Sequence, residues 1–297
     1  MVLTGNSANA LIDRTALIRN RKRAVARPVE GCDFLAKLAL EDTVLRLSAI
    51  KRRFVSAVDL NSHGPSMRAA LLKSDQIDKV FQTRDPGFVA LDGIDAVADN
   101  EALPLGPGVA DLIVSNLNLQ FVNDLPGVLI QIRRALKPDG LFLGNLIGGS
   151  SLHELKDAFL TAEAEITGGA QARFVPFIDV RDGGGLLQRA GFALPVADTD
   201  LVTVRYSDPV ALMRDLRAMG AANPLARRSR RPLRKKVLQR AIEIYEERYR
   251  DEDGRIRACF EIISLSGWAP HESQQKPLRP GSAAVSLKDV LQTNGPS

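Results

Sequence analysis

The sequence predicts an α/β fold in which a seven-stranded sheet carries helices on both faces. Apolar strand-like runs alternate with helical patterns along most of the 297 residues, which is typical of sheets built from crossover units. Residues 111–142 predict one complete strand, helix and strand, because Lys137-Pro138-Asp139-Gly140 stops the helix directly before an apolar run. Two helices without an intervening strand then predict a small helical insertion between strands six and seven.

Each predicted strand is a short, mostly apolar run, and the helices show apolar residues at helical spacing. The strands cover Val55–Leu60, Lys79–Gln82, Ile94–Ala98, Asp111–Ser115, Leu141–Leu146, Leu201–Tyr206 and Arg257–Leu265. The helices cover Leu35–Phe54, Ser151–Gly168, Val180–Ala190, Asp208–Gly220 and Pro232–Tyr249. This order divides the chain into a basic N-terminal helix (1–30), a core (31–206), a helical lid (207–256) and a closing strand with a tail (257–297).

The composition and the residue spacing exclude an integral membrane protein and give no pattern of metal ligands. The chain is 45% hydrophobic, and no apolar run approaches the length of a membrane span. Two cysteines (Cys32, Cys259) and three histidines (His63, His153, His271) lie far apart without metal-ligand spacing. We therefore expect a reducing compartment and no metal site.

The net charge of +5 is placed unevenly. A basic block at 227–236 has no interleaved aromatic residue on which bases could stack, and acidic residues follow it, so we expect no nucleic-acid partner. The first 29 residues are rich in arginine, which suits either a mitochondrial presequence or an amphipathic helix around Asp13–Arg19 packed on the domain. We favour the helix.

Four further segments carry a family resemblance. They are DNEALP at 99–104, FVNDLP at 121–126, FIDVRDGGGLLQRAGF at 177–192 and GWAPHESQQKPLRPGSA at 267–283. With the LKPDG turn at 136–140, they resemble the class I S-adenosylmethionine-dependent methyltransferases, which have a Rossmann-like fold. Within that superfamily the chain resembles bacterial relatives of complex I assembly factor 5, beside the malonyl-carrier-protein methyltransferases of biotin synthesis. The resemblance extends from about Asp13 to about Ala284, and the segment at 267–283 is its most specific part.

The resemblance implies S-adenosylmethionine as cofactor and methyl transfer to a protein or an acyl-carrier substrate. Eukaryotic members of the group help to assemble respiratory complex I and are linked to arginine hydroxylation of one of its subunits. A second reading is therefore a hydroxylase-like assembly factor whose partner is a respiratory complex subunit. A third is a non-catalytic scaffold. The resemblance begins so near the N-terminus that it implies a cytoplasmic bacterial protein, or a matrix protein if the source is eukaryotic.

The loop after the first strand departs from the family pattern of an acid followed by spaced glycines. Asp59 stands in the acidic position, but Asn61, His63 and Pro65 stand where glycine is expected, and Gly64 is out of step. Asparagine tolerates a left-handed backbone, whereas proline fixes φ and removes a donor. We expect Asp59, Asn61 and Gly64 to contact cofactor, although the loop favours the scaffold reading.

The remaining cofactor residues follow the next three strands, at the edge where such sheets bind ligands. Arg84 stands where the resemblance implies a ribose-binding acid, and a shift of one residue would bring Asp85 into that role. Asp99 is implied to bind the adenine amino group. The other expected contacts are Asn100, Ser115, Asn116 and Leu117.

The sequence names no catalytic base. Methyl transfer from a sulfonium needs mainly alignment and a deprotonated acceptor, and His153 and His271 are candidates only by residue type. Phe121 suits either the site or core packing. The tail residues Glu272, Lys276 and Arg279 could close over the site or bind a partner, but we rank a docked structural segment above both.

Overall fold

The computed structural model describes residues 10–87 and 95–275. Its centre is one seven-stranded sheet, as predicted. The strands lie in the order β3-β2-β1-β4-β5-β7-β6, and only β7 is antiparallel to its neighbours. The strands are β1 (Phe54–Leu60), β2 (Ile77–Arg84), β3 (Ala96–Val97), β4 (Ala110–Asn116), β5 (Leu136–Ile147), β6 (Ala193–Tyr206) and β7 (Ile256–Trp268). Because the strands preceding β6 are parallel, their carboxyl ends meet at one edge.

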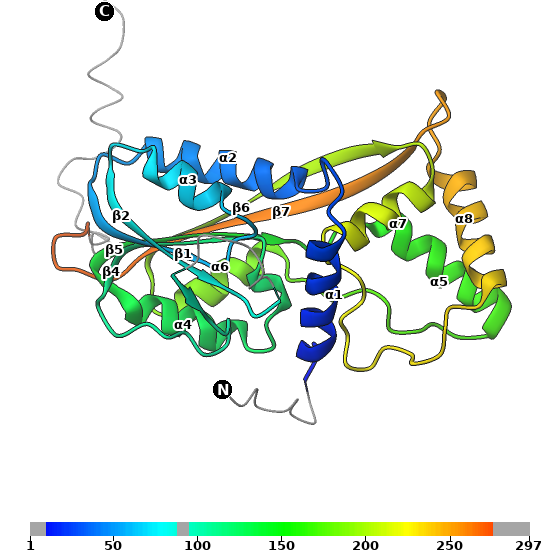
Figure 1. The fold of residues 1–297 in the computed structure, drawn as a ribbon, viewed down its shortest axis with the longest axis horizontal. Coiled ribbons are helices and arrows are strands. Elements are labelled where there is room, and N and C mark those ends of the chain that lie inside the picture. Colours follow the sequence, from blue (N-terminus) through cyan, green and yellow to red (C-terminus); the bar gives the residue numbers. More distant parts are fainter. Residues whose placement is uncertain (1–9, 88–94, 276–297) are drawn as a thin grey trace, which may run out of the picture.

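Helices cover both faces of the sheet (Figure 1). They are α1 (Arg14–Ala26), α2 (Phe34–Ser48), α3 (Ser66–Leu72), α4 (Leu125–Ala135), α5 (His153–Thr167), α6 (Val180–Arg189), α7 (Pro209–Ala218) and α8 (Lys235–Tyr249), with a 3₁₀ turn at Leu119–Phe121. Four of them start at an aspartate whose carboxylate accepts a hydrogen bond from the first turn: Asp13, Asp124, Asp179 and Asp208.

Two apolar clusters hold α2, α3, α4 and α6 on the sheet. On one face Leu47 of α2 and Leu71 of α3 pack with strand residues such as Leu112. On the other face Leu129 of α4 and Leu187 of α6 pack around Phe142 and its neighbours. The central strands are therefore buried on both sides, which explains why their sequences are continuous apolar runs.

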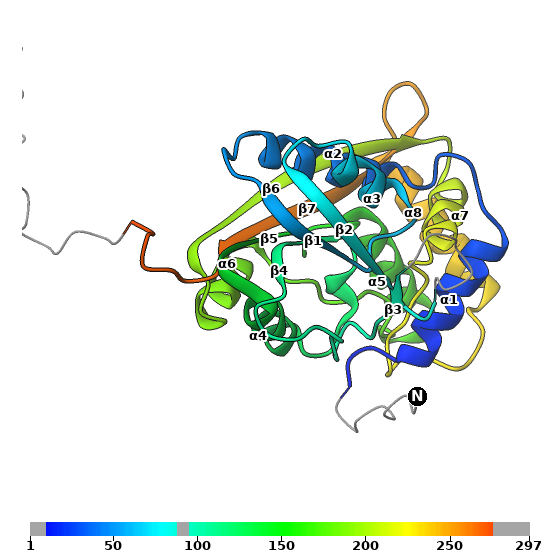
Figure 2. The same cartoon turned by 60° about the vertical axis from the view of Figure 1, so that its left-hand side comes forward.

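A third apolar cluster lies beyond the end of the sheet, where α5, α7 and α8 pack around the long antiparallel pair of β6 and β7 (Figures 1 and 2). Helices α7 and α8 lie between β6 and β7 in the chain, as the sequence predicts. Helix α1 crosses between the sheet and this helical group (Figure 1). Its N-cap residue is Asp13, which agrees with the predicted amphipathic helix.

Several predicted bounds are wrong. The helix predicted over Leu35–Phe54 ends at Ser48, because the Phe54 ring is buried as the first residue of β1. Strand β5 begins at Leu136 rather than Leu141, since the LKPDG turn forms an irregularity in the pairing with β4. Strand β6 begins at Ala193 rather than Leu201, and α3 was not predicted. Ile94 and the tail beyond residue 275 lie outside the described residues.

We expect the third cluster to depend on the buried hydroxyl of Tyr245, which donates to the Arg257 carbonyl over 2.6 Å. The variant Tyr245→Phe leaves that carbonyl unpaired and should lower the free energy of unfolding by about 1 kcal/mol in urea titrations. Tyr249→Phe, which removes a more exposed hydroxyl from the same helix, is the control and should cost less. Equal losses would contradict this role of Tyr245.

Candidate functional site

Asp59 ends β1 in a buried environment beneath the predicted cofactor loop. Its Oδ2 accepts a hydrogen bond of 2.5 Å from Nε2 of Gln82, which pairs with it across β1 and β2. Burial raises the pKa of Asp59 from an ordinary value of 3.8 to about 6. The acidic position predicted from sequence is therefore filled by a carboxyl group that readily holds a proton.

The loop after Asp59 tolerates its missing glycines. Asn61 takes a left-handed backbone (φ 57°), and its side chain donates to Asn100 Oδ1 over 2.6 Å. Gly64 has φ +77°, where a side chain would be strained, and its carbonyl accepts from Gln82 Nε2. Pro65 directly precedes α3, where its missing N–H costs no helical hydrogen bond. The loop therefore keeps the required turn with different residues.

Asp85 and Asp99 both lie at the carboxyl edge, and each pairs with an arginine of α1. Arg21 Nη1 lies 2.9 Å from Asp85 Oδ2, and both side chains are buried. Arg14 forms an ion pair with Asp99 Oδ2. No local pattern indicates that the basic N-terminal helix supplies these partners, because α1 is far from both aspartates along the chain.

Arg84 completes β2 and is fully buried, so the shift of one residue that would place Asp85 at the strand's end has not occurred within the strand. Its Nη2 donates to Gln82 Oε1 over 3.3 Å, while Nε and Nη1 have no hydrogen-bond partner among the described residues. Burial lowers the pKa of Arg84. Asp85 follows directly and is the nearest acid in sequence for a ribose-binding role.

The turn after β4 brings polar atoms to the same edge. Ser115 Oγ is buried and has no hydrogen-bond partner among the described residues. Asn116 Nδ2 donates to the Ala36 carbonyl over 2.9 Å, which leaves its Oδ1 without a partner in the described part of the chain. Leu117 has φ 48° and faces the adjoining cavity. Asn118, which the sequence analysis did not select, donates to Asn100 Oδ1.

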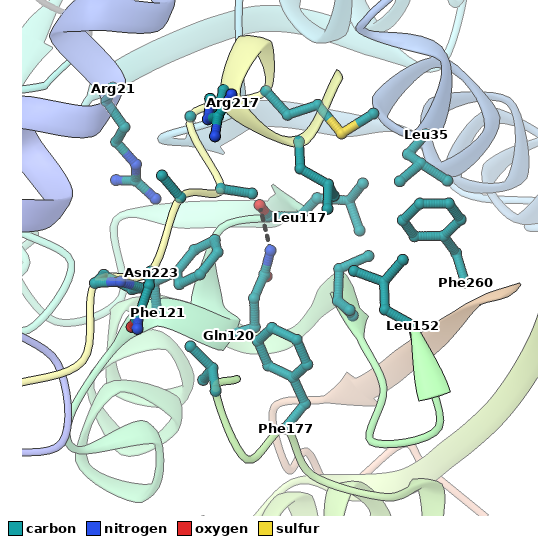
Figure 3. Close-up of a pocket in the computed structure, with 18 of the residues that line it drawn as sticks. Arg21, Leu35, Leu117, Gln120, Phe121, Leu152, Phe177, Arg217, Asn223 and Phe260 are labelled. Atoms are coloured by element: carbon teal, nitrogen blue, oxygen red, sulfur yellow. Dashed lines mark hydrogen bonds between the residues drawn. The ribbon is translucent and has the colours of Figure 1, made fainter. Parts of the chain in front are cut away.

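A cavity of about 400 Å³ adjoins this edge on the side of α5 and α7 (Figure 3). Its walls are mostly aliphatic and aromatic, including Leu117, Leu152, Phe177 and Phe260. Asn61, Asn116 and Leu117 line it, whereas Asp59, Gly64, Asp85, Asp99, Asn100 and Ser115 do not. The predicted site residues thus divide into a closed group at the sheet edge and a group that opens into the cavity.

The charged residues of the lining are mostly basic. The described lining includes three arginines, Arg21, Arg173 and Arg217, and one acidic residue, Asp33. The Arg173 guanidinium is paired with Glu163, whereas the Arg217 guanidinium makes no hydrogen bond or ion pair with another described residue; the backbone carbonyl of Arg217 accepts from the Gly220 N–H. Among the described lining residues, the Arg217 guanidinium is therefore the cation that can meet a ligand without first leaving a partner in the chain.

Two further lining residues, His63 and Gln120, hold polar groups among the apolar walls. Burial, followed by the charges of Arg21 and Arg84, lowers the pKa of His63, which keeps its imidazole neutral at physiological pH. Gln120 donates to the Leu117 carbonyl over 2.8 Å and leaves Oε1 without a partner among the described residues.

Phe121 packs edge-on against Phe177 with 6.1 Å between ring centroids, and it also lines the cavity.

Outside the cavity, His153, Glu154 and Cys259 lie with one ligand-type atom of each within 4.8 Å of the others. The sequence analysis found no metal-ligand spacing because these residues approach only through the contact of α5 with β7. The Glu154 carboxylate already accepts from the Cys259 backbone N–H, and most of His153 is exposed. His271 lies elsewhere, bonded to Ser273.

The described residues fit the adenosine and amino-acid parts of S-adenosylmethionine. The orphaned amide oxygens of Asn61 and Asn116 are acceptors suited to an ammonium group. Asp85, Asp99 and Asn100 carry acceptor oxygens of the kind that an adenine amino group and ribose hydroxyls require, and in this structure these oxygens have partners within the chain. The departure from the family pattern is Arg84, which offers donors at the end of β2 where the pattern has an acid.

The raised pKa of Asp59 predicts a specific pH dependence of stability. Because the folded state holds this proton more tightly, its stabilising effect is complete below about pH 4 and is lost as the pH rises through about 6. Asp59→Asn mimics the protonated form, so its stability relative to wild type should rise by up to about 3 kcal/mol between pH 4 and pH 7. Urea unfolding at both pH values measures this difference, and an unchanged difference would contradict it.

Comparison with known proteins identifies the fold and its relatives. The YcgJ protein from Bacillus subtilis, 12% identical, superposes with a TM-score of 0.53 over 79% of this chain and 99% of its own. The family described as a methyltransferase domain matches residues 56–144. Among residues 10–87 and 95–275, no helix is long and apolar enough to cross a bilayer.

Relatives of higher identity narrow the family. The human protein named arginine-hydroxylase NDUFAF5, mitochondrial, is 37% identical over 287 residues, covering 94% of this chain and 83% of that protein. A malonyl-[acyl-carrier protein] O-methyltransferase of Laribacter hongkongensis is 39% identical over 62% of this chain and 59% of its own length. S-adenosylmethionine is the cofactor of this superfamily. The chain belongs to the class I S-adenosylmethionine-dependent methyltransferase superfamily, in the family that includes the arginine-hydroxylase NDUFAF5.

Proposed function

We propose that this protein binds S-adenosylmethionine at the carboxyl edge of the sheet and methylates an apolar, negatively charged acceptor in the adjoining cavity. The observation that carries the proposal is the shared wall: Asn61, Asn116 and Leu117 belong to the cofactor edge and also line the cavity. A bound acceptor would therefore lie beside the cofactor. An acyl group on a carrier protein has the required shape and charge.

The residues divide the binding between them. Asp99 and Asn100 bind the adenine, and Asp85 binds the ribose. The orphaned oxygens of Asn61 and Asn116 accept from the ammonium group, and the Ser115 hydroxyl, which has no partner among the described residues, directly precedes Asn116 in the chain. The bound cofactor supplies an electrophilic methyl group.

The chain itself contributes position and surroundings rather than a base. An acceptor carboxylate is already ionised at physiological pH, so no residue of the chain would need to remove a proton before its oxygen could accept the methyl group that the cofactor would supply. The apolar walls exclude water from the reacting oxygen. Arg217 orients the negative acceptor, and segment 207–256 acts as the lid over it.

Arginine hydroxylation is the second candidate, and two observations favour it. The human relative of that name matches far more of the chain than the Laribacter methyltransferase does. The unpartnered Oε1 of Gln120 could accept from a guanidinium. The basic charge of the lining opposes a guanidinium and ranks this candidate second. A subunit of a respiratory complex would then be the partner, in the bacterial cytoplasm or in the mitochondrial matrix of a eukaryote.

Two assays on the full chain separate these functions. Calorimetric titration with S-adenosylhomocysteine tests the cofactor site, and we expect saturable binding with one site. Transfer of a labelled methyl group is then measured with malonyl-acyl carrier protein and with an arginine-containing peptide. Methylation of the carrier protein supports the proposal, mass gain of one oxygen on the peptide supports hydroxylation, and absent cofactor binding leaves the scaffold reading.

Removal of the available cation in the cavity should weaken acceptor binding alone. We expect Arg217→Gln to raise KM for malonyl-acyl carrier protein about tenfold, the loss of roughly one charge-assisted contact, with kcat and S-adenosylhomocysteine affinity unchanged. Arg214→Gln is the matched control, because Arg214 lies on the same helix but does not line the cavity. An unchanged KM in Arg217→Gln would remove Arg217 from the acceptor site.

A further inference from the structure

Helix α1 places two arginines on the carboxylates that the cofactor needs. We propose that α1 is a strap: it closes the adenosine subsite when no cofactor is bound, and cofactor binding displaces its arginines and loosens the lid. The inference rests on the proposed cofactor site. It adds a regulatory element that couples cofactor binding to access to the cavity.

Both carboxylates are fully engaged by the chain itself. Asp99 Oδ1 accepts from the Glu101 backbone N–H over 2.9 Å, and its Oδ2 pairs with Arg14. Asp85 Oδ1 accepts from the Gly87 N–H over 2.8 Å, and its Oδ2 pairs with Arg21. One oxygen of each aspartate therefore fixes its own loop, while the other is held by α1. A cofactor hydroxyl or amino group must compete for that second oxygen.

The neighbouring amide is also satisfied internally. Asn100 Oδ1 accepts from both Asn61 and Asn118. Arg21 Nη2 in turn donates to Asn118 Oδ1 over 2.6 Å, so one continuous network joins the loops after β1, β2, β3 and β4. The expected acceptors Asp85, Asp99 and Asn100 are thus bonded within the chain and do not line the cavity, whereas Asn61, Asn118 and Arg21 of the same network do.

Arg21 is inserted tightly at this position. Its side chain is buried, and its guanidinium lies 5.6 Å from the centre of the Phe121 ring. A Cβ added to Gly87 would meet Arg21 Cβ at 2.7 Å, and one added to Gly220 would lie 3.4 Å from its Cα. Glycines on the cofactor side and on the lid side therefore allow α1 to sit between both.

The opposite contacts of α1 are with the segment that joins α7 to α8. The Asp13 carboxylate forms an ion pair with Arg228 at 2.8 Å, and the backbone N–H of Asp13 donates to the Pro224 carbonyl over 2.8 Å. Asn20 donates to the Ala222 carbonyl over 2.7 Å. Because residues 222–228 belong to the proposed lid, movement of α1 away from the carboxylates changes the support of the lid as well.

The test compares S-adenosylhomocysteine affinity of full-length wild type, Arg14→Gln and Arg14→Gln/Arg21→Gln by calorimetry. Arg19→Gln is the control, because Arg19 is exposed on the same helix and carries the same charge. If α1 competes with cofactor, loss of the Arg14 ion pair should tighten binding roughly three- to tenfold, whereas Arg19→Gln should not. Hydrogen exchange of α1 amides in the wild type should become faster when S-adenosylhomocysteine is added.

The outcomes separate the strap from the cofactor site itself. Wild-type binding with unchanged or weaker affinity in Arg14→Gln, or α1 amides that exchange no faster when cofactor binds, overturns the strap and leaves the cofactor site intact. Binding by the variants but not by the wild type supports the strap. Failure of wild type and of Arg14→Gln to bind overturns both proposals. Exchange in the wild type keeps the test decisive if the double variant does not fold.

Discussion

The pairing of Asp85 and Asp99 with arginines of α1 is the interaction on which the state of this site depends. Parallel strands bring the two acids to one edge of the sheet, where uncompensated carboxylates would be costly to bury. Arg14 and Arg21 neutralise them from outside the sheet. The same helix is bound to the lid segment through Asp13. Cofactor edge, helix and lid therefore form one connected unit.

The lining of the cavity indicates which kind of substrate this unit could bind. Its apolar walls can hold an acyl chain, and Arg217 can attract a negative group without first breaking an ion pair within the described chain. The side-chain amide oxygens of Asn61 and Gln120 accept no hydrogen bond from the residues that the structure describes. The cavity thus contains both a cation that attracts an anionic substrate and amide oxygens that can accept a hydrogen bond. This combination suits a negatively charged substrate beside a cofactor that carries an ammonium group.

Local sequence signals predicted the sheet and most helices because each element has its own apolar pattern and stop signal. The bounds failed where a contact distant in sequence decides, as for Phe54, whose burial in β1 makes the preceding helix end at Ser48. Asp59, Asp99 and Asn116 lie at the carboxyl edge, as the family resemblance and the strand order imply, and their contact with cofactor stays a prediction. Arg14 and Arg21 were missed, since their partners are brought close only by the fold, and no local pattern marks the cavity.

A crystal structure of the complex with S-adenosylhomocysteine would test the central claim most directly. The account predicts adenine against Asp99 and Asn100, ribose against Asp85, and the side chains of Arg14 and Arg21 withdrawn from both carboxylates. Adenosine bound at this edge with both arginine–carboxylate pairs intact would contradict the strap. A ligand bound elsewhere on the chain would contradict the cofactor site.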